Sequence, residues 1–483
     1  MQFETEHRST SLNLPLFQQL ACRLGVPQLF DFQKLALSAV LSRKDSFLVV
    51  PTGGGKSFCY ILPSLVLPGL VLVVSPLIAL MRDQQRQLVE LEIPCLTYDS
   101  LLSSDEKRAA REKILNQRIK VLYVSPERLA VEGFRDLLRG LDISLVAIDE
   151  AHCVHQWGTG FRPEYRRLGA NLDEITAAPR MALTATVTSR ERLEIIESLR
   201  MRNPEIIVRA APRQNLELRV INKGKPEEIK RSLIRAVDEN EGKGIIYAST
   251  RKNVDEIYRL LRSGNKRVGL YHGGLLGDER RFQQEAFSSD EHDVIVATKA
   301  FGMGIDYPHI RYVLHANMPC SIESYVQEVG RAGRDGLKSH CVLHYGPKDF
   351  YIQKFMIEKS FPKEPDLVQV LGGLKVMFQD KVALRLEDLV TQISASTHLN
   401  QADIQLVLDF LYREQVYQSA ELWNESFELW EPCLTRSEKE YDFEMVLGLL
   451  QHQLNWRFEK LRAMHQLVKL GDCPRNYIEQ YFV

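Results

Sequence analysis

A glycine-rich stretch at residues 51–57 is suited to hold phosphate groups. It reads Pro-Thr-Gly-Gly-Gly-Lys-Ser and directly follows an apolar run that ends at Val50. Glycines let the backbone point its N–H groups at a phosphate, and a helix starting at the loop adds the positive end of its dipole. In such a loop Lys56 would reach the β- and γ-phosphates and Ser57 would bind Mg²⁺. The full pattern has glycine where Val50 stands, so a simple glycine-rich turn is the alternative.

An acidic pair about 90 residues further on could supply a metal ligand and a base. Asp149 and Glu150 follow the apolar run 145–148, and the carboxyl ends of strands are where α/β sheets hold their chemistry. Asp149 would hold Mg²⁺, and Glu150 would orient or deprotonate the attacking water. An acidic helix start is the simpler interpretation of an isolated pair, but here a phosphate loop lies upstream in the same half.

Two arginines in the second half could stabilise charge on a phosphate during its transfer. Arg331 and Arg334 lie three residues apart, so we expect them on one helical face. Planar, permanently charged guanidinium groups suit the charge that develops on a γ-phosphate. A solvated basic helix end is the alternative. Together with the phosphate loop, these arginines predict ATP bound between two halves that open and close during hydrolysis.

The elements that must position these residues alternate between strands and helices in both halves. Short apolar runs predict buried parallel strands joined by helices. They lie at 46–50, 70–74, 120–124 and 145–148 in the first half, and at 244–247, 268–271, 294–297 and 312–315 in the second. The expected class is α/β with two tandem domains, which together with the phosphate loop resemble P-loop domains of the RecA-like type. The join should lie near 210–212.

After about residue 360 the pattern changes. A helix is expected at 386–393 and a second after Asn400, which looks like an N-cap with Asp403 in the first turn. A hairpin should follow from about 416 to 430, which completes the outline of a winged helix, and a helical tail should run from about 438 to 483. The expected domains are therefore 1–209, 210–350, 365–432 and 433–483.

Composition limits the class of protein. Net charge is −1, so a grip on nucleic acid would need local basic surface or backbone amides. The eight cysteines are scattered without a Cys-x-x-Cys pair, which argues against a disulfide framework. No stretch is apolar for long enough to cross a bilayer, and the first ten residues are too polar for a secretory signal. We expect a cytoplasmic protein without a membrane partner, associated with the nucleoid if it is bacterial.

The order of these motifs closely resembles the RecQ family of superfamily-two helicases, with Asp149–His152 as a DEAH-type motif. The similarity covers roughly residues 15–350. Its specific stretches are 51–60, 75–84, 124–129, 149–153, 156–158, 161–166, 183–186, 300–305 and 327–336. The resemblance implies an ATP- and Mg²⁺-dependent helicase that moves 3′ to 5′ on single-stranded DNA and unwinds forked or tailed duplexes in repair and recombination.

The resemblance also implies roles for single residues. The catalytic set would be Lys56, Asp149, Glu150, Gln327, Arg331 and Arg334. ATP would be bound by Gln33, which reads adenine in the family, and by Thr52, Gly53, Gly54, Gly55, Lys56, Ser57 and Asp306. DNA would contact Ser75, Pro76, Arg82, Gln84, Ser125, Arg128, Trp157, Phe161, Arg162 and Thr298, with the aromatic residues stacking on bases. Thr184 and Thr186 would link the ATP site to the strand, and His272 would act in the second domain.

Three departures from the family pattern stand out. Val26 and Phe30 replace an aromatic residue and an arginine near the adenine, which would alter nucleotide grip or selectivity. Residues 159–160, Thr-Gly, replace His-Asp in the coupling loop, so coupling of DNA to hydrolysis could differ. Cys473 resembles the first ligand of the family's zinc module without its three later partners. One cysteine cannot form a tetrahedral zinc site, so we expect no structural zinc and no terminal helicase-and-RNase-D-like domain.

Alternative functions stay open at this point. An RNA-dependent ATPase would also carry Asp149–His152, and a DNA-binding ATPase that anneals or remodels strands would tolerate the altered coupling loop. A P-loop metabolic kinase is a more distant alternative, because it needs no second α/β domain with paired arginines. Trp423, near the expected hairpin tip, could wedge the first base pair apart, although packing against its own domain is the simpler interpretation. Protein partners are not indicated.

Overall fold

The chain folds into two compact units joined by two passages of the backbone. The structure is a computed structural model that describes residues 4–482 apart from 52, 100–101, 117, 155–163, 210–211, 223–225, 263, 265, 303–306, 308, 379–382, 415, 425–428, 437–441 and 472–473. The main unit comprises Met1–Pro347 and Gln466–Val483, and the inserted unit comprises Lys348–His465. No helix in the described part of the chain is long and apolar enough to cross a membrane.

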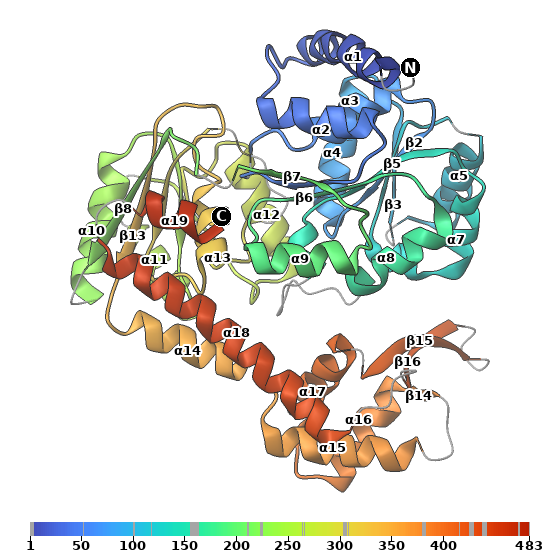
Figure 1. Ribbon diagram of the computed structural model, residues 1–483. Coiled ribbons are helices and arrows are strands. Elements are labelled where there is room, and N and C mark those ends of the chain that lie inside the picture. The colour runs from blue at the N-terminus through green and yellow to red at the C-terminus, as the bar shows by residue number, and fades with distance from the viewer. Residues whose placement is uncertain are drawn as a thin grey trace. The chain divides into compact units, whose positions relative to one another are not determined.

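The main unit contains a seven-stranded parallel sheet in the order β3-β4-β2-β5-β6-β1-β7 (Figure 1). Its strands are β1 (Ser46–Val49), β2 (Leu70–Val74), β3 (Cys95–Tyr98), β4 (Val121–Val124), β5 (Ile143–Ile148), β6 (Arg180–Thr184) and β7 (Glu205–Val208). The helices around it are α1 (Glu4–Arg23), α2 (Asp31–Leu41), α3 (Phe58–Val66), α4 (Ile78–Glu90), α5 (Ser104–Leu115), α6 (Pro126–Ala130), α7 (Glu132–Arg139), α8 (Glu164–Ile175) and α9 (Ser189–Ser198). The central strands are buried along almost their whole length because helices cover both faces of the sheet, as α2 and α9 do on opposite sides of β6 and β7.

A second parallel sheet of six strands belongs to the same unit, in the order β10-β11-β9-β12-β13-β8. Its strands are β8 (Leu216–Asn222), β9 (Lys243–Tyr247), β10 (Val268–Tyr271), β11 (Val294–Ala297), β12 (Ile310–His315) and β13 (Ser339–Tyr345). The helices here are α10 (Pro226–Glu239), α11 (Arg251–Leu261), α12 (Gly277–Ser288), α13 (Ile322–Val329) and, from the far end of the chain, α19 (Arg475–Phe482). The predicted α/β class with two parallel sheets is confirmed, and all eight predicted strands are present.

The inserted unit is mostly helical with one small antiparallel sheet. It contains α14 (Asp349–Lys359), α15 (Glu364–Met377), β14 (Ala383–Arg385), α16 (Leu386–Ser396), α17 (Gln401–Arg413), β15 (Tyr417–Asn424) and β16 (Leu429–Arg436). α18 (Phe443–Lys469) begins in this unit and ends in the main unit. The predicted N-cap is present, because the Asn400 side chain accepts a bond of 2.9 Å from the Asp403 backbone N–H.

The hairpin of the inserted unit is longer than expected. The predicted boundary at 432–433 lies inside β16, where Cys433 pairs with Ala420. A strand cannot be divided between two domains without losing its ladder, so this boundary is wrong. Trp423 lies on β15 opposite Trp430, and its side chain lies outside the described part of the structure. The winged-helix assignment, the wedge and the other domain boundaries stay predictions.

Candidate active site

The loop at residues 51–57 follows β1 and adopts a shape that only glycine allows at several positions. Gly53 and Gly55 have φ of +72° and +79°, a region that side chains with a Cβ rarely adopt. A Cβ on Gly54 would lie 2.9 Å from the Pro51 carbonyl oxygen. Lys56 folds back so that its Nζ donates to the Val50 carbonyl at 3.2 Å. The backbone therefore forms a tight cradle at the carboxyl end of β1, with the lysine across it.

Gln33 fixes the outer side of this cradle. Its side chain is buried, donates to the Gly55 carbonyl at 2.9 Å and accepts from the Phe30 backbone N–H at 2.9 Å. A Cβ on Gly55 would lie 3.0 Å from Gln33 Nε2. Beside it, the Phe30 ring is about half exposed, and the Arg209 guanidinium lies 5.7 Å from its centroid. The predicted adenine-reading residue thus lies against the predicted phosphate loop, next to an aromatic face.

The acidic pair lies at the carboxyl end of β5, in the same sheet as the loop. Asp149 is buried, and its Oδ1 accepts from the Glu150 backbone N–H at 2.9 Å. Burial and the adjacent Glu150 carboxylate raise the pKa of Asp149 to about 6. Burial also opposes ionisation of Glu150, but His152, Lys56 and Arg331 together lower the pKa of Glu150 to about 2. Both carboxyl groups therefore lie within electrostatic reach of the loop lysine.

These residues fit a magnesium nucleotide. Ser57 precedes α3 as its N-cap, yet its hydroxyl makes no capping bond; it accepts a long bond of 3.4 Å from Gln84 Nε2 and interacts with the Tyr60 hydroxyl. Hydroxyl and carboxylate oxygens are ligands that a hard cation prefers. Because burial disfavours the ionised form of the carboxylate, a bound cation would stabilise that form. Asp149 and Ser57 would hold Mg²⁺, and the glycine cradle with Lys56 would hold the phosphates.

His152 connects the acidic pair to the second sheet. Its Nδ1 lies 3.1 Å from Glu150 Oε2 and 3.0 Å from Thr184 Oγ1. Its Nε2 lies 3.4 Å from Nε2 of Gln327, on α13. Burial lowers the pKa of His152, but Cys153 and Glu150 more than offset it, so the net shift is upward. The sequence singled out this histidine only as part of a motif, and its bridging contacts were not predicted.

Arg331 and Arg334 reach the same site, although not from a helix. The expectation of a shared helical face is wrong, because α13 ends at Val329 and Gly333, with φ of +58°, continues the chain as a turn. Arg331 donates to the Gly302 carbonyl, and its charge acts on Glu150 of the first sheet. A Cβ on Gly53 would lie 3.0 Å from Cγ of Arg334. Both arginines thus face the groups of the first half.

The residues predicted to bind DNA after β2 are buried, form an ion pair or face the phosphate loop. Ser75 and Pro76 are buried. Arg82 forms two hydrogen bonds with the buried Asp99, at 2.8 and 3.1 Å. Gln84 turns towards the phosphate loop, where it accepts from the Tyr60 hydroxyl at 2.9 Å and faces Ser57. The position of Gln84 indicates that this side chain connects α4 with the phosphate loop. The role of Gln84 as a DNA contact stays a prediction.

Some of the residues predicted to contact DNA after β4 and β11 already interact with other residues of the protein. Ser125 caps α6 by accepting from the Arg128 backbone N–H at 3.3 Å. The Arg128 guanidinium lies over the rings of Tyr98 and Phe134, 4.7 and 5.0 Å from their centroids. Thr298 is half-buried just past β11. The following residues lie outside the described part of the structure, so their roles stay predictions: Thr52, Trp157, Phe161, Arg162, Asp306 and Cys473.

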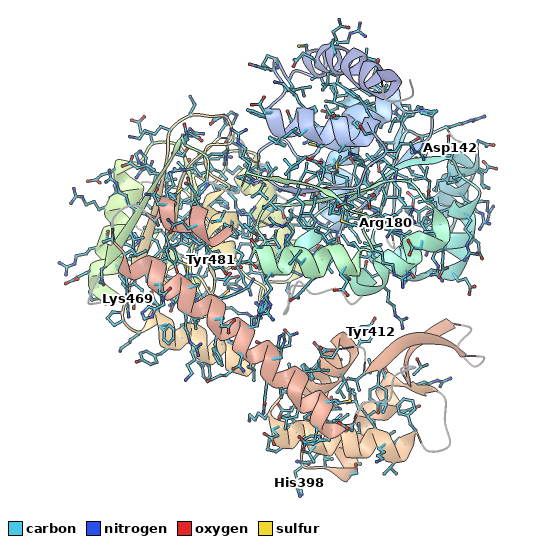
Figure 2. The ribbon with its side chains drawn as sticks, in the orientation of Figure 1. Asp142, Arg180, His398, Tyr412, Lys469 and Tyr481 are labelled. Carbon is cyan, nitrogen blue, oxygen red and sulfur yellow. The ribbon has the colours of Figure 1, made fainter. Side chains whose placement is uncertain are left out.

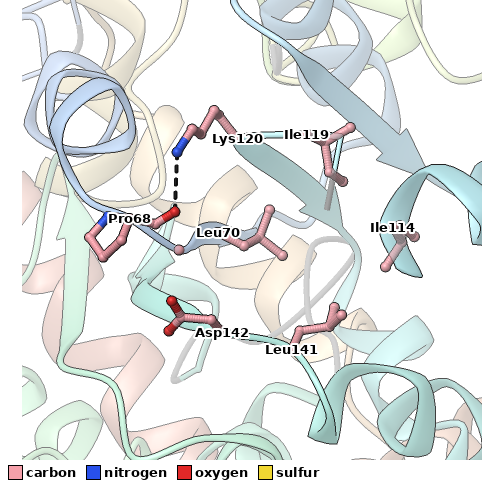
Figure 3. A pocket seen from close by; sticks show the side chains of 8 residues that line it. Pro68, Leu70, Ile114, Ile119, Lys120, Leu141 and Asp142 are labelled. Atoms are coloured by element: carbon pink, nitrogen blue, oxygen red, sulfur yellow. Dashed lines mark hydrogen bonds between the residues drawn. The ribbon is translucent and has the colours of Figure 1, made fainter. Parts of the chain in front are cut away.

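A small pocket of about 30 Å³ lies at the opposite, amino-terminal end of the first sheet (Figure 3). Leu70, Ile119 and Asp142 line it, and Lys120 Nζ donates to the Pro68 carbonyl at 3.2 Å across one side. It contains none of the loop, acidic or arginine residues. Because ligands of open α/β sheets bind at the carboxyl ends of the strands, this pocket is not the candidate site.

Comparison with known proteins identifies both halves of the main unit. The DEAD/DEAH box helicase family matches residues 30–195, and the helicase conserved C-terminal domain matches residues 224–336. Among solved structures, the DUF1998 helicase MrfA bound to DNA and AMPPNP aligns with a TM-score of 0.56 at 22% identity, over 70% of this chain and 51% of that one. The Mycobacterium smegmatis helicase Lhr aligns with a TM-score of 0.52 at 19% identity, over 85% and 60%. At these identities the structures show the fold alone.

Curated relatives are more similar in sequence. The ATP-dependent DNA helicase RecQ of Bacillus subtilis is 42% identical over 361 residues, which cover 74% of this chain and 59% of the relative. The RecQ of Pasteurella multocida is 42% identical over 69% of this chain and 52% of its own length, so the chain spans little more than half of these relatives. The probable ATP-dependent DNA helicase RecS of B. subtilis is 38% identical over 93% of this chain and 85% of the relative. With a nucleotide cradle, an acidic pair and two arginines brought together from two parallel sheets, the chain belongs to the RecQ family of ATP-dependent DNA helicases.

Proposed function

We propose that the protein is an ATP-driven motor that moves 3′ to 5′ on single-stranded DNA and unwinds tailed or forked duplexes in repair and recombination. The observation that carries this proposal is that one site draws charged groups from both sheets. Arg331 acts on Glu150 across the two halves, and Gln327 lies beside His152. A site divided in this way changes when the halves move apart, so hydrolysis and movement would be coupled.

The residues would divide the chemistry as follows. The glycine cradle and Lys56 would hold the β- and γ-phosphates, and Gln33 would read the adenine. Mg²⁺, when bound at Asp149 and Ser57, would neutralise charge on the phosphate oxygens. Glu150, whose low pKa keeps it ionised at neutral pH, would accept hydrogen bonds from the attacking water and orient it. Arg331 and Arg334 would stabilise the charge that develops on the γ-phosphate.

DNA binding rests on the resemblance and on the names of the relatives. Arg82, with its side chain nearly half exposed, and Arg128 lie beyond the carboxyl ends of β2 and β4. Guanidinium groups at this edge would contact phosphates of the strand, and the aromatic segment around Trp157 would supply stacking faces. The absence of structural zinc and a cytoplasmic, nucleoid-associated location stay predictions.

The test is ATP hydrolysis with and without single-stranded DNA, together with unwinding of a 3′-tailed duplex, for the wild type and Lys56→Ala. We expect DNA to stimulate hydrolysis, strands to separate, and Lys56→Ala to abolish both. Single-stranded RNA serves as the parallel arm, and stronger stimulation by RNA would favour an RNA-dependent ATPase. Hydrolysis that ignores DNA, with strand annealing in place of separation, would contradict the motor proposal.

A further inference from the structure

The helix α19 holds the segment that precedes β8 by means of one arginine. The Arg475 guanidinium donates to the Leu216 carbonyl at 2.8 Å, to the Arg213 carbonyl at 3.2 Å, and to the Pro212 carbonyl. The three backbone acceptors are divided between the two terminal nitrogens of one planar guanidinium, an arrangement that the single ammonium nitrogen of a lysine would not reproduce. The position of residues 212–216 therefore depends on a residue that follows them by more than 250 positions.

The same segment holds the turn that carries the candidate catalytic arginines. The Arg213 side chain donates to the carbonyls of Gly330, Ala332 and Gly333 at 2.7, 2.6 and 2.7 Å. Asn215 Nδ2 adds bonds of 2.8 Å to the Gly333 and Leu337 carbonyls. These carbonyls flank Arg331 and directly precede Arg334, so their hydrogen bonds fix the backbone from which both guanidinium groups project.

A second contact joins α19 to the helix that leads into this turn. Tyr481 of α19 is labelled in Figure 2. Its hydroxyl donates to Glu323 Oε1 at 3.0 Å, and Glu323 is buried in the first turn of α13. The Arg475 charge also acts on Tyr325 of the same helix. α19 therefore contacts the start of α13 directly. It is connected to the arginine turn, at the other end of α13, through Arg213.

We propose that α19 is a brace for the arginine turn, and that Arg475 is a positioning residue for ATP hydrolysis that acts through Arg213. This inference rests on the proposed function, since it assigns the rate of hydrolysis to the placement of Arg331 and Arg334. A displacement of catalytic groups by about 1 Å can cost on the order of a hundredfold in rate. The brace therefore governs kcat and leaves the nucleotide cradle at the other sheet intact.

The test compares Arg475→Gln, Arg475→Lys and the matched control Gln480→Ala, an exposed position on the same helix. We expect Arg475→Gln to lower kcat for ATP hydrolysis roughly 10- to 100-fold, with KM for ATP changed less than about threefold. Arg475→Lys should recover only part of the loss, because the three donors of an ammonium leave from one nitrogen and do not match acceptors divided between the two nitrogens of a planar guanidinium. Gln480→Ala should match the wild type. A kcat of Arg475→Gln within twofold of the wild type would overturn the proposal.

A second variant background distinguishes the positioning role of Arg475 from a merely structural one. In protein that carries both Arg331→Ala and Arg334→Ala, Arg475→Gln should cost little more, because the two groups that it positions are already gone. A loss of the same factor in both backgrounds would mean that Arg475 acts elsewhere. If Arg475→Gln does not fold, Tyr481→Phe, which keeps the ring and removes one hydrogen bond, should lower kcat about threefold without changing KM.

The failure of the brace and the failure of the proposed function give different results. A wild type without ATP hydrolysis would contradict the proposed function alone. In that case amide hydrogen exchange at residues 330–334 decides the brace: Arg475→Gln must accelerate exchange in this turn, and unchanged exchange overturns the proposal.

Discussion

The Nε2 atoms of Gln327 and His152 lie 3.4 Å apart, although the two residues belong to different parallel sheets. Gln327 lies on α13 beside the second sheet, and His152 follows β5 of the first. His152 in turn faces Glu150 and Thr184, so this single contact connects the proposed water-orienting residue to the second parallel sheet. A contact of this kind exists only while the two halves are close together. Its formation therefore links the approach of the two halves to the surroundings of the acidic pair.

Replacing Gln327 should therefore slow hydrolysis without weakening ATP binding. Gln327→Ala removes one hydrogen bond at a partly buried site, which corresponds to roughly a tenfold loss in kcat. The measurement is steady-state ATP hydrolysis with single-stranded DNA in excess. Gln401→Ala, at an exposed position of α17, is the control and should behave as the wild type. An unchanged kcat for Gln327→Ala would show that the contact does not matter for hydrolysis.

Gly55→Ala should weaken nucleotide binding. The residue has φ of +79°, and the added Cβ would lie 3.0 Å from Gln33 Nε2, so both backbone strain and collision oppose the native loop. A left-handed conformation costs a residue with a Cβ about 1–2 kcal/mol, which corresponds to a Kd for ATP raised roughly 5- to 30-fold. Titration with a fluorescent ATP analogue measures this. Gly140→Ala, where a Cβ would meet no atom within 4 Å, should leave the Kd unchanged.

Phe30 should contribute to the affinity for the base. The residue is 51% exposed beside Gln33, with the Arg209 guanidinium 5.7 Å and the Phe32 ring 5.8 Å from its ring centroid, and we expect an adenine to contact the exposed part of the ring. Stacking of a base on an aromatic ring contributes about 1–3 kcal/mol, so Phe30→Ala should raise KM for ATP roughly tenfold and leave kcat within twofold. Phe282→Ala, at a ring that is 58% exposed on α12, controls for loss of surface aromatic area. Equal KM values in the two variants would exclude Phe30 from the adenine site.

Asp45 should stabilise the first sheet. Its buried carboxylate accepts from the backbone N–H groups of Arg180 and Arg202, at 2.7 and 2.5 Å, and so joins three segments at one end of the strands. Asp45→Ala leaves two donors without a partner and should cost about 2–4 kcal/mol in the free energy of unfolding, measured by urea. Asp136→Ala removes a surface ion pair with Arg139 and should change stability far less. A loss no larger than that of Asp136→Ala would contradict this role.

Most of the strands that could be predicted carry short, nearly continuous apolar runs. β1, β2, β4 and β5 are apolar apart from Ser46 and Ser144 and are almost fully buried, as parallel strands covered on both faces require. β6 is equally buried but was not predicted, because it begins with Arg180 and ends with Thr184. β3 and β8 lie at sheet edges, and their sequences mix polar and apolar residues because one side of each has no neighbouring strand. β14, with three residues, is too short for any periodicity.

The candidate site divides along similar lines. Residues 51–57 could be singled out because the chemistry of the loop follows from residue type and spacing in one short region, whereas Gln33 was assigned only by the resemblance to the RecQ family. The helical placement of Arg331 and Arg334 failed because Gly330 and Gly333 end α13 earlier than periodicity suggests. The contacts of Arg213 and Arg475 run to backbone carbonyls far away in the sequence, and backbone acceptors leave no mark on the residue types around them.

The insertion of one unit within the other has a consequence for the newly made chain. On a ribosome that adds about 5–20 residues per second, the arginine turn emerges first, then the whole inserted unit, and only afterwards α19 with Arg475. A nascent chain could thus fold both parallel sheets and still lack the contacts that hold the turn in place. Competence for hydrolysis would then appear late in synthesis, after the inserted unit is already present.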